Sequence, residues 1–175
     1  MIAGSLTGIE RHFEPDEIIV TKTDAGGRIT YANPVFLRVS GLTEREALGA
    51  PHNVIRHPDM PRCVFKLLWD TVRAGGEIFA YIVNRATNGD HYWVLAHVTP
   101  TFDAQGRIAG FHSNRRAPGR HVVERTIAPL YRELLDEERR HSGKAGGMAA
   151  SLDRLDTLLA GKGLDYERFI FSLQD

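Results

Sequence analysis

Residues 51–61 read PHNVIRHPDMP, and the rest of the chain is arranged around this stretch. It holds two histidines, an arginine, an aspartate and an asparagine, and its three prolines stiffen the backbone. Apolar Val54 and Ile55 separate these polar groups. Fixed polar groups on an apolar lining are typical of the wall of a small-molecule pocket. A connector whose polar groups cap neighbouring helices is the alternative, and the composition fits both.

The sequence before this stretch predicts a β-hairpin. Residues 18–23 are rich in β-branched side chains, residues 24–27 form a turn that contains two glycines, and residues 28–32 form the return strand. Residues 1–14 precede the hairpin as a cap segment. Leu6 and Ile9 indicate a short leading helix within it.

Two short helices are predicted between the hairpin and the stretch at 51–61. Asn33 and Pro34 are typical of a helix N-cap and first helical position. Thr43 and Glu46 have the spacing of a capping box, which predicts the start of the second helix.

The sequence after residue 61 predicts one helix and a three-stranded meander. The helix begins at Pro61 and ends at a pair of glycines, and the strands follow at 78–85, 91–102 and 107–116. Two strands, short helices and three further strands indicate an α+β fold. We expect a five-stranded antiparallel sheet with helices on one face, within a domain that spans residues 15–118.

Residues 119–175 form a predicted C-terminal helical extension. Apolar residues repeat at four-three-four spacing from Val123 to Leu134, and Pro129 either kinks this helix or lies in the first turn of its main part. Residues 142–147 are predicted to be a flexible linker, and two more helices follow it. These helices either complete the core or form a surface for dimerisation or partner docking. We expect the second role, because the α+β unit is complete without them.

The bulk properties indicate an ordinary globular protein of 175 residues. Its net charge is zero and its pI is about 7.1, which argues against nucleic acid as the main partner. No apolar run has membrane-spanning length, and the N-terminus lacks the pattern of a secretory signal. Cys63 is the single cysteine, so no internal disulfide can form. We expect a cytoplasmic location.

Residues 24–33 and 40–44 resemble the opening of a PAS sensory domain. Residues 56–61, followed by residues 88–94, resemble one branch of that family, the PAS domains of bacterial aerotaxis transducers. The resemblance covers roughly residues 15–135 and implies a PAS fold. It also implies that the domain binds FAD and reports the redox state of the cofactor to a chemotaxis signalling module.

The resemblance also implies which residues lie at or near the cofactor. Within that site, Phe65 and Trp69 would wall a flat apolar slot, and Arg56 would bind the pyrophosphate. Asn33, Asn84 and His97 would serve the edge of the flavin ring. The full set of expected cofactor-binding residues is Asn33, His52, Arg56, His57, Asp59, Phe65, Trp69, Asn84 and His97.

The expected function is that of a stand-alone redox or oxygen sensor that signals in trans. Its predicted partner is a chemotaxis transducer or kinase, contacted through the C-terminal helices, and we expect a homodimer. The strand at 78–85 departs from the family because it lacks a tryptophan at its start. The alternative is therefore a PAS interaction module whose pocket is empty or holds another small ligand. We expect no enzymatic activity and no metal site, because no nucleophile-base pattern or metal-ligand spacing is visible.

Overall fold

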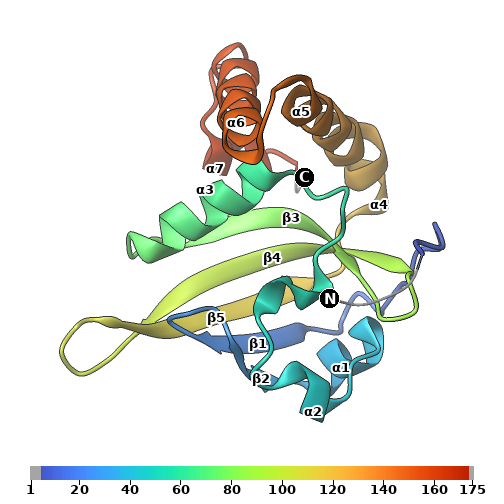
Figure 1. Ribbon diagram of the computed structural model, residues 1–175, viewed down its shortest axis with the longest axis vertical. Coiled ribbons are helices and arrows are strands. Elements are labelled where there is room, and N and C mark those ends of the chain that lie inside the picture. Colours follow the sequence, from blue (N-terminus) through green and yellow to red (C-terminus); the bar gives the residue numbers. More distant parts are fainter. Residues whose placement is uncertain (1–4, 174–175) are drawn as a thin grey trace. The chain divides into compact units, whose positions relative to one another are not determined.

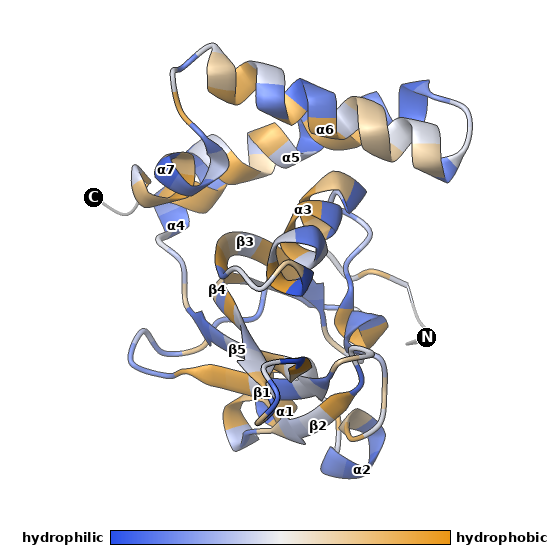
Figure 2. Cartoon of the chain, turned by 90° about the vertical axis from the view of Figure 1, so that its left-hand side faces the viewer, coloured by the Kyte–Doolittle hydropathy of each residue, from blue (hydrophilic) through white to orange (hydrophobic). Residues whose placement is uncertain are grey.

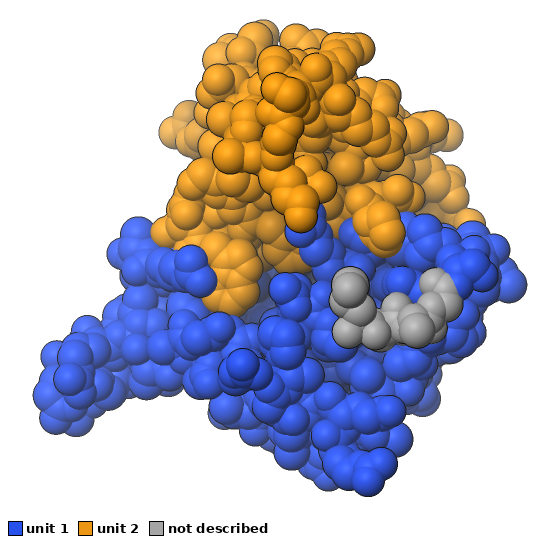
Figure 3. All heavy atoms as spheres, viewed as in Figure 1, with its two compact units in different colours: residues 1–57, 71–117 blue, residues 58–70, 118–175 orange. Residues whose placement is uncertain are grey.

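The computed structural model describes residues 5–173, which divide into two compact units (Figure 3). Unit 1 comprises residues 5–57 and 71–117, and unit 2 comprises residues 58–70 and 118–173. One division between the units falls after Ala117, one residue before the predicted domain boundary at 118/119, and that boundary stays a prediction. Residues 58–70, which the sequence assigned to the sheet domain, belong with the C-terminal helices.

Unit 1 contains a five-stranded antiparallel sheet (Figure 1). Its strand order is β2-β1-β5-β4-β3, so the N-terminal hairpin pairs with the last strand of the meander. The predicted α+β fold with a C-terminal helical extension is confirmed, and each strand begins and ends within one residue of its predicted range. The strands are β1 (Ile19–Asp24), β2 (Ile29–Ala32), β3 (Ile78–Arg85), β4 (His91–Phe102) and β5 (Ile108–Arg116).

Two short helices and one 3₁₀ turn connect β2 to residue 57, and their caps follow the sequence. They are α1 (Pro34–Ser40), α2 (Glu44–Ala47) and η1 (His52–Ile55). The Asn33 side chain accepts a hydrogen bond from the Phe36 amide as the N-cap of α1. Thr43 and Glu46 form both hydrogen bonds of the capping box. The stretch at 51–61 therefore contains one turn of 3₁₀ helix within irregular backbone.

The N-terminal segment is extended, so the predicted leading helix is wrong. Glu10 forms a parallel bridge with His91, and the Thr7 amide donates to the Gly89 carbonyl at 3.1 Å. Pairing with the β3–β4 hairpin satisfies the same backbone groups that a short helix would satisfy internally, and an isolated helix of this length is marginal. The first four residues of the predicted segment lie outside the described residues.

Unit 2 consists of helices. Helix α3 (Arg62–Arg73) contributes its residues up to 70, and the rest are α4 (Arg120–Val122), η2 (Val123–Ile127), α5 (Ala128–Arg140), α6 (Lys144–Ala160) and α7 (Tyr166–Phe171). Pro129 lies in the first turn of α5. It has no N–H to donate, and residues 123–127 form a π-helical turn. Of the two predicted alternatives for Pro129, the structure thus shows the second, a place in the first turn of the main part of the helix.

The predicted linker at 142–147 is mostly helical, which corrects that expectation. Helix α6 begins at Lys144, so the irregular connection is limited to residues 141–143. The packing around Gly147 explains why this helix contains a glycine. A Cβ at this position would lie 2.3 Å from the carbonyl oxygen of Glu138 on α5. The glycine is therefore needed for a close helix crossing, which composition alone cannot distinguish from flexibility.

The apolar stripes of the C-terminal helices are buried. Hydrophilic and hydrophobic residues alternate along α5 and α6 (Figure 2), and the buried members of the predicted four-three-four repeats include Ile127, Leu134, Leu155 and Leu159. Ile170 on α7 is buried as well. No helix among residues 5–173 combines the length and the apolar composition that a membrane span needs.

Candidate ligand-binding face of the sheet

The buried face of the sheet carries a row of polar side chains. Directly opposed residues on neighbouring strands point to the same side, and side chains two apart on a strand do so as well. The register places Thr21 opposite Ser113 and Asn84 opposite Tyr92, and it places Ala96 opposite Arg115. All members of the row are buried: Thr21, Thr23, Asn84, Tyr92, Ser113 and Arg115.

Arg115 is the centre of this row. It is 2% exposed, and its Nη2 atom donates to Thr21 Oγ1 at 2.8 Å and approaches His52 Nε2 at 2.6 Å. Its guanidinium also lies 6.0 Å from the centroid of the Phe36 ring. Among the described residues, no carboxylate forms an ion pair with this guanidinium. Burial lowers the pKa of Arg115 to about 10, so it remains a cation at neutral pH.

His52 is neutral and accepts from Arg115. Guanidinium nitrogens only donate hydrogen bonds, so Nε2 of His52 must be unprotonated and Nδ1 must hold the ring proton. Burial, followed by the positive charge of Arg115, lowers the pKa of His52 to about 3. Within the described part of the chain, the site therefore contains a single positive charge, which is neither reinforced by a histidine charge nor neutralised by an acid.

Several polar atoms of this face are buried and have no hydrogen-bond partner within the described protein. They are Thr23 Oγ1, Asn84 Nδ2, Tyr92 OH, Ser113 Oγ and Arg115 Nη1. Burial also raises the pKa of the Tyr92 phenol, which keeps its proton. An unpaired buried polar group costs on the order of 1–3 kcal/mol. So many on one sheet face indicate a site built for a ligand that offers hydrogen-bond acceptors.

The structure places three of the predicted residues at this face. His52 contacts Arg115 directly, and Asn84 is in the polar row. Arg56 is partly buried and pairs through its backbone with Asn84, in an antiparallel bridge. His57 is buried and its ring lies 5.7 Å from that of His91. The stretch at 51–61 thus meets the sheet at the strand that carries Asn84.

Two predicted residues of unit 1 are placed elsewhere. The Asn33 amide is engaged in structure: its Oδ1 accepts from Val20 N and its Nδ2 donates to Ile18 O, so it ties α1 to the start of β1. His97 points to the opposite face of the sheet from Ala96 and Arg115. It stacks on Phe79 with ring centroids 4.2 Å apart and contacts Glu77 at 2.6 Å.

The other three predicted residues belong to unit 2. Phe65 and Trp69 lie on α3, and Asp59 is exposed just before that helix. Their roles stay predictions from the resemblance.

Sequence reasoning missed Arg115, Thr21, Tyr92 and Ser113. A signal for Arg115 was present, because it is two and four residues from Ser113 and Phe111 and therefore in the buried phase of its strand. A cation at a buried strand position is rare unless it is paired or functional. The contact between Arg115 and His52, 63 positions apart, required the fold.

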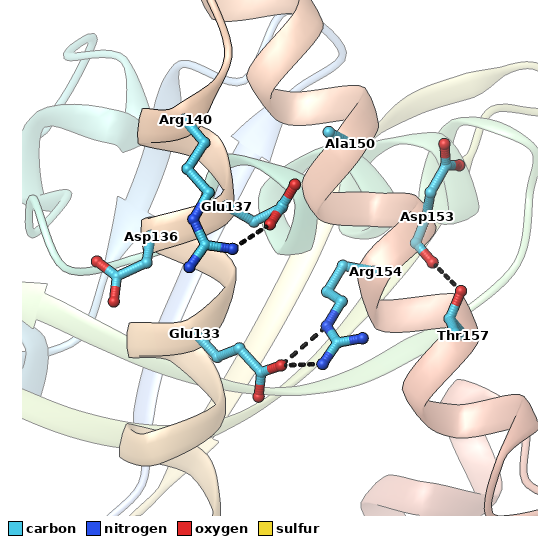
Figure 4. Close-up of a pocket in the computed structure, with 8 residues that line it drawn as sticks. All are labelled: Glu133, Asp136, Glu137, Arg140, Ala150, Asp153, Arg154 and Thr157. Atoms are coloured by element: carbon cyan, nitrogen blue, oxygen red, sulfur yellow. Dashed lines mark hydrogen bonds and ion pairs between the residues drawn. The ribbon is translucent and has the colours of Figure 1, made fainter.

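A second concave region lies between α5 and α6 in unit 2 (Figure 4). Four acidic and two basic side chains from the two helices line it, and each arginine pairs with a glutamate. Arg154 contacts Glu133 at 2.5 Å, and Arg140 contacts Glu137 at 3.0 Å. Each arginine of this groove is already engaged by a carboxylate at the protein surface, so the groove offers a ligand fewer unpaired donors than the sheet face does.

Comparison with known proteins agrees with the fold. Residues 29–115 match the family model described as PAS fold. The chain is 41% identical over 120 residues to the aerotaxis receptor of Escherichia coli K12, a match that covers 68% of this chain and 23% of the receptor. It is 28% identical over 122 residues to a nitrogen fixation regulatory protein of Klebsiella pneumoniae, a match that covers 66% of this chain and 24% of that protein. The chain thus spans about a quarter of these curated relatives.

Solved structures show the same architecture. The PAS domain of a Colwellia psychrerythraea protein has a TM-score of 0.53 and 19% identity, covering 58% of this chain and 86% of that one. The dark structure of the blue-light photoreceptor Aureochrome1 LOV has a TM-score of 0.55 and 22% identity, and the match covers 67% of this chain and 84% of that one. The chain therefore contains a PAS domain, one that resembles the corresponding region of the aerotaxis receptor.

Proposed function

We propose that this PAS domain binds a flavin, with FAD as the first candidate, and senses redox state or oxygen. The observation that supports this most strongly is Arg115, a buried cation whose Nη1 atom has no partner within the described residues. A flavin supplies reversible oxidation and reduction when it is bound. One solved light-oxygen-voltage domain with this fold was studied with a flavin analogue.

The residues present fit such a ligand. A flavin ring has an edge of carbonyl and ring-nitrogen atoms that accept hydrogen bonds. Arg115 Nη1, Tyr92 OH and Asn84 Nδ2 are donors without partners, and hydroxyls of Ser113 and Thr23 can donate or accept. The buried cation favours a ligand that carries or gains negative charge, since opposite charges attract strongly where water is excluded.

His52 positions the guanidinium. Its lowered pKa, about 3, keeps its Nε2 atom available as an acceptor throughout the physiological range. With one side of Arg115 held by His52 and Thr21, the Nη1 side is oriented without a ligand having to organise it. Arg56, His57, Asp59, Phe65 and Trp69 remain proposed contributors from the resemblance.

The signalling role is part of the same proposal. We infer that the chain is not an enzyme but a cytoplasmic sensor that acts on a chemotaxis transducer or kinase, and that it forms a homodimer. The relatives with signalling names, the aerotaxis receptor and the nitrogen fixation regulatory protein, support a sensory role.

An absorption spectrum of the purified chain, followed by titration with FAD, tests the proposal. We expect the bands of oxidised flavin, or saturable binding that raises the melting temperature. Arg115→Met should weaken flavin binding about tenfold or more, because it removes a charge-assisted hydrogen bond.

Arg116→Met is the matched control, since Arg116 is the next residue, is exposed and points to the other face. It should bind flavin like the wild type. Without ligand, Arg115→Met should be at least as stable as the wild type, because it replaces a buried cation with an apolar chain of similar length. A colourless protein that does not bind FAD would favour the alternative, a cofactor-free interaction module.

A further inference from the structure

A buried carboxylate from the C-terminal helices caps helix α3. Glu138 on α5 is 7% exposed, and its Oε1 atom accepts hydrogen bonds from the backbone amides of Arg62 at 2.6 Å and Cys63 at 3.2 Å. Its Oε2 atom lies 3.9 Å from Arg62 Nη1. Glu138 is 76 positions from Arg62 along the chain, so this cap joins distant segments of unit 2.

Helix α3 directly follows Met60 and Pro61, and neither side chain accepts hydrogen bonds strongly. The first amides of a helix lack partners within it and carry partial positive charge. A carboxylate accepts hydrogen bonds from these amides and balances their partial positive charge, and here it comes from another helix.

Helix α6 adds two contacts at the same place. The Ser151 hydroxyl donates to Cys63 Sγ at 2.9 Å, and both residues are fully buried. Gly147 packs against the backbone of Glu138 itself. The start of α3, the end of α5 and the first half of α6 therefore meet around one charged group.

We propose that Glu138 is a latch that fastens the α5–α6 hairpin to α3, and that opening this latch uncovers the apolar stripes of α5 and α6. The inference rests on the proposed sensory function for its biological use. Helix α3 is the element the two units share, because its residues 71–73 belong to unit 1. A change at α3 can thus reach the C-terminal helices through this cap.

Cys63 provides a built-in reporter, because it is the single cysteine of the chain and is buried under Ser151. Burial also raises its pKa to about 11. Labelling with a thiol reagent on the intact chain without cofactor should be slow in the wild type. Glu138→Gln keeps an acceptor but removes the charge, and should speed labelling about tenfold or more.

Glu137→Gln is the matched control, because Glu137 is adjacent and its carboxylate pairs with Arg140 and His141 instead of with α3. Its labelling rate should equal that of the wild type. If Glu138→Gln does not fold, the same labelling is measured on Glu138→Asp, which keeps the charge on a shorter side chain.

Hydrogen exchange identifies where the protein opens. In Glu138→Gln, amides of α6 and the first turn of α3 should exchange faster, while amides of β4 should not change. Equal labelling rates in the wild type and Glu138→Gln would overturn the proposal, and so would a uniform rise in exchange that includes β4. Because no flavin is present, either result is independent of whether the domain binds one.

Discussion

At the scale of single residues, Arg115 and His52 are the most informative pair. A buried arginine usually has an acidic partner, yet among residues 5–173 Arg115 contacts a hydroxyl, an imidazole and an aromatic ring. The cost of this arrangement is acceptable where a ligand completes it. The same pair makes stability depend on pH in a predictable way.

The pKa of His52 predicts a loss of stability in mild acid. Its folded pKa is about 3 and its unfolded pKa is about 6.5, so between these values the unfolded chain binds one more proton. This contribution is fully present above pH 6.5 and is lost as pH falls toward 3. Between pH 6.5 and 5 the free energy of unfolding should fall by about 2 kcal/mol through this group.

Urea unfolding of the wild type and His52→Gln at both pH values measures this effect. Glutamine supplies an acceptor for Arg115 but does not titrate, so the variant should lose less stability between the two pH values. Parallel pH profiles for the two proteins would mean that His52 has the same pKa in the folded and the unfolded chain.

At the scale of elements, one pair of adjacent glycines in α6 shows how context decides the role of a residue. Both stand in a segment whose composition is typical of a linker. A Cβ at Gly147 would meet the Glu138 carbonyl oxygen, whereas a Cβ at Gly146 would meet no atom within 4 Å. The two positions are both helical, so they differ in packing and not in backbone conformation.

Alanine at these two positions should therefore change stability in opposite directions. Gly147→Ala should destabilise the protein by about 1–3 kcal/mol, because the helices must separate to admit a methyl group. Gly146→Ala should stabilise it by about 0.5–1 kcal/mol, since alanine favours the helix. Chemical denaturation of both variants measures the difference, and equal effects would mean that α5 and α6 do not cross at Gly147.

At the scale of the whole chain, contacts between distant segments fix what local patterns leave open. The N-terminal segment is held at the β3–β4 hairpin by Asp90, which accepts from Thr7 Oγ1 at 2.6 Å and from Arg11 Nε at 3.0 Å. Hydrogen bonds from Thr7, Asn88 and Arg11 lower the pKa of Asp90 to about 2. Arg11 also donates to the Val39 carbonyl, so one side chain joins three segments.

Replacing Asp90 with asparagine should release this segment. Trypsin cleaves after arginine, and Arg11 should be cleaved several times faster in Asp90→Asn because local opening becomes easier. Mass spectrometry of timed digests identifies the cut. Asp103→Asn is the control, because Asp103 binds Arg107 in the other hairpin of the meander and should leave cleavage at Arg11 unchanged. Equal cleavage at Arg11 in both variants would mean that Asp90 does not hold the segment.

The sequence by itself determined the elements of the sheet domain. Strand alternation, the glycine-containing turns and the caps at Asn33 and Thr43 are local, and each acts through the residues next to it in the chain. That is why all five strands, α1, α2 and the start of α3 could be predicted. Of the candidate site, sequence reasoning reached the stretch at 51–61 and Asn84, which the structure brings to the polar face through His52 and the Arg56–Asn84 bridge.

Only the tertiary structure decided which distant residues meet. It showed that Arg115 stands against His52, that His97 faces away, that Gly147 belongs to a helix crossing and that Glu138 caps α3. These facts depend on strand register and helix packing across tens of residues, which local pattern does not encode. A buried charge is stabilised by whatever the fold places beside it, and the identity of that neighbour is a property of the folded chain.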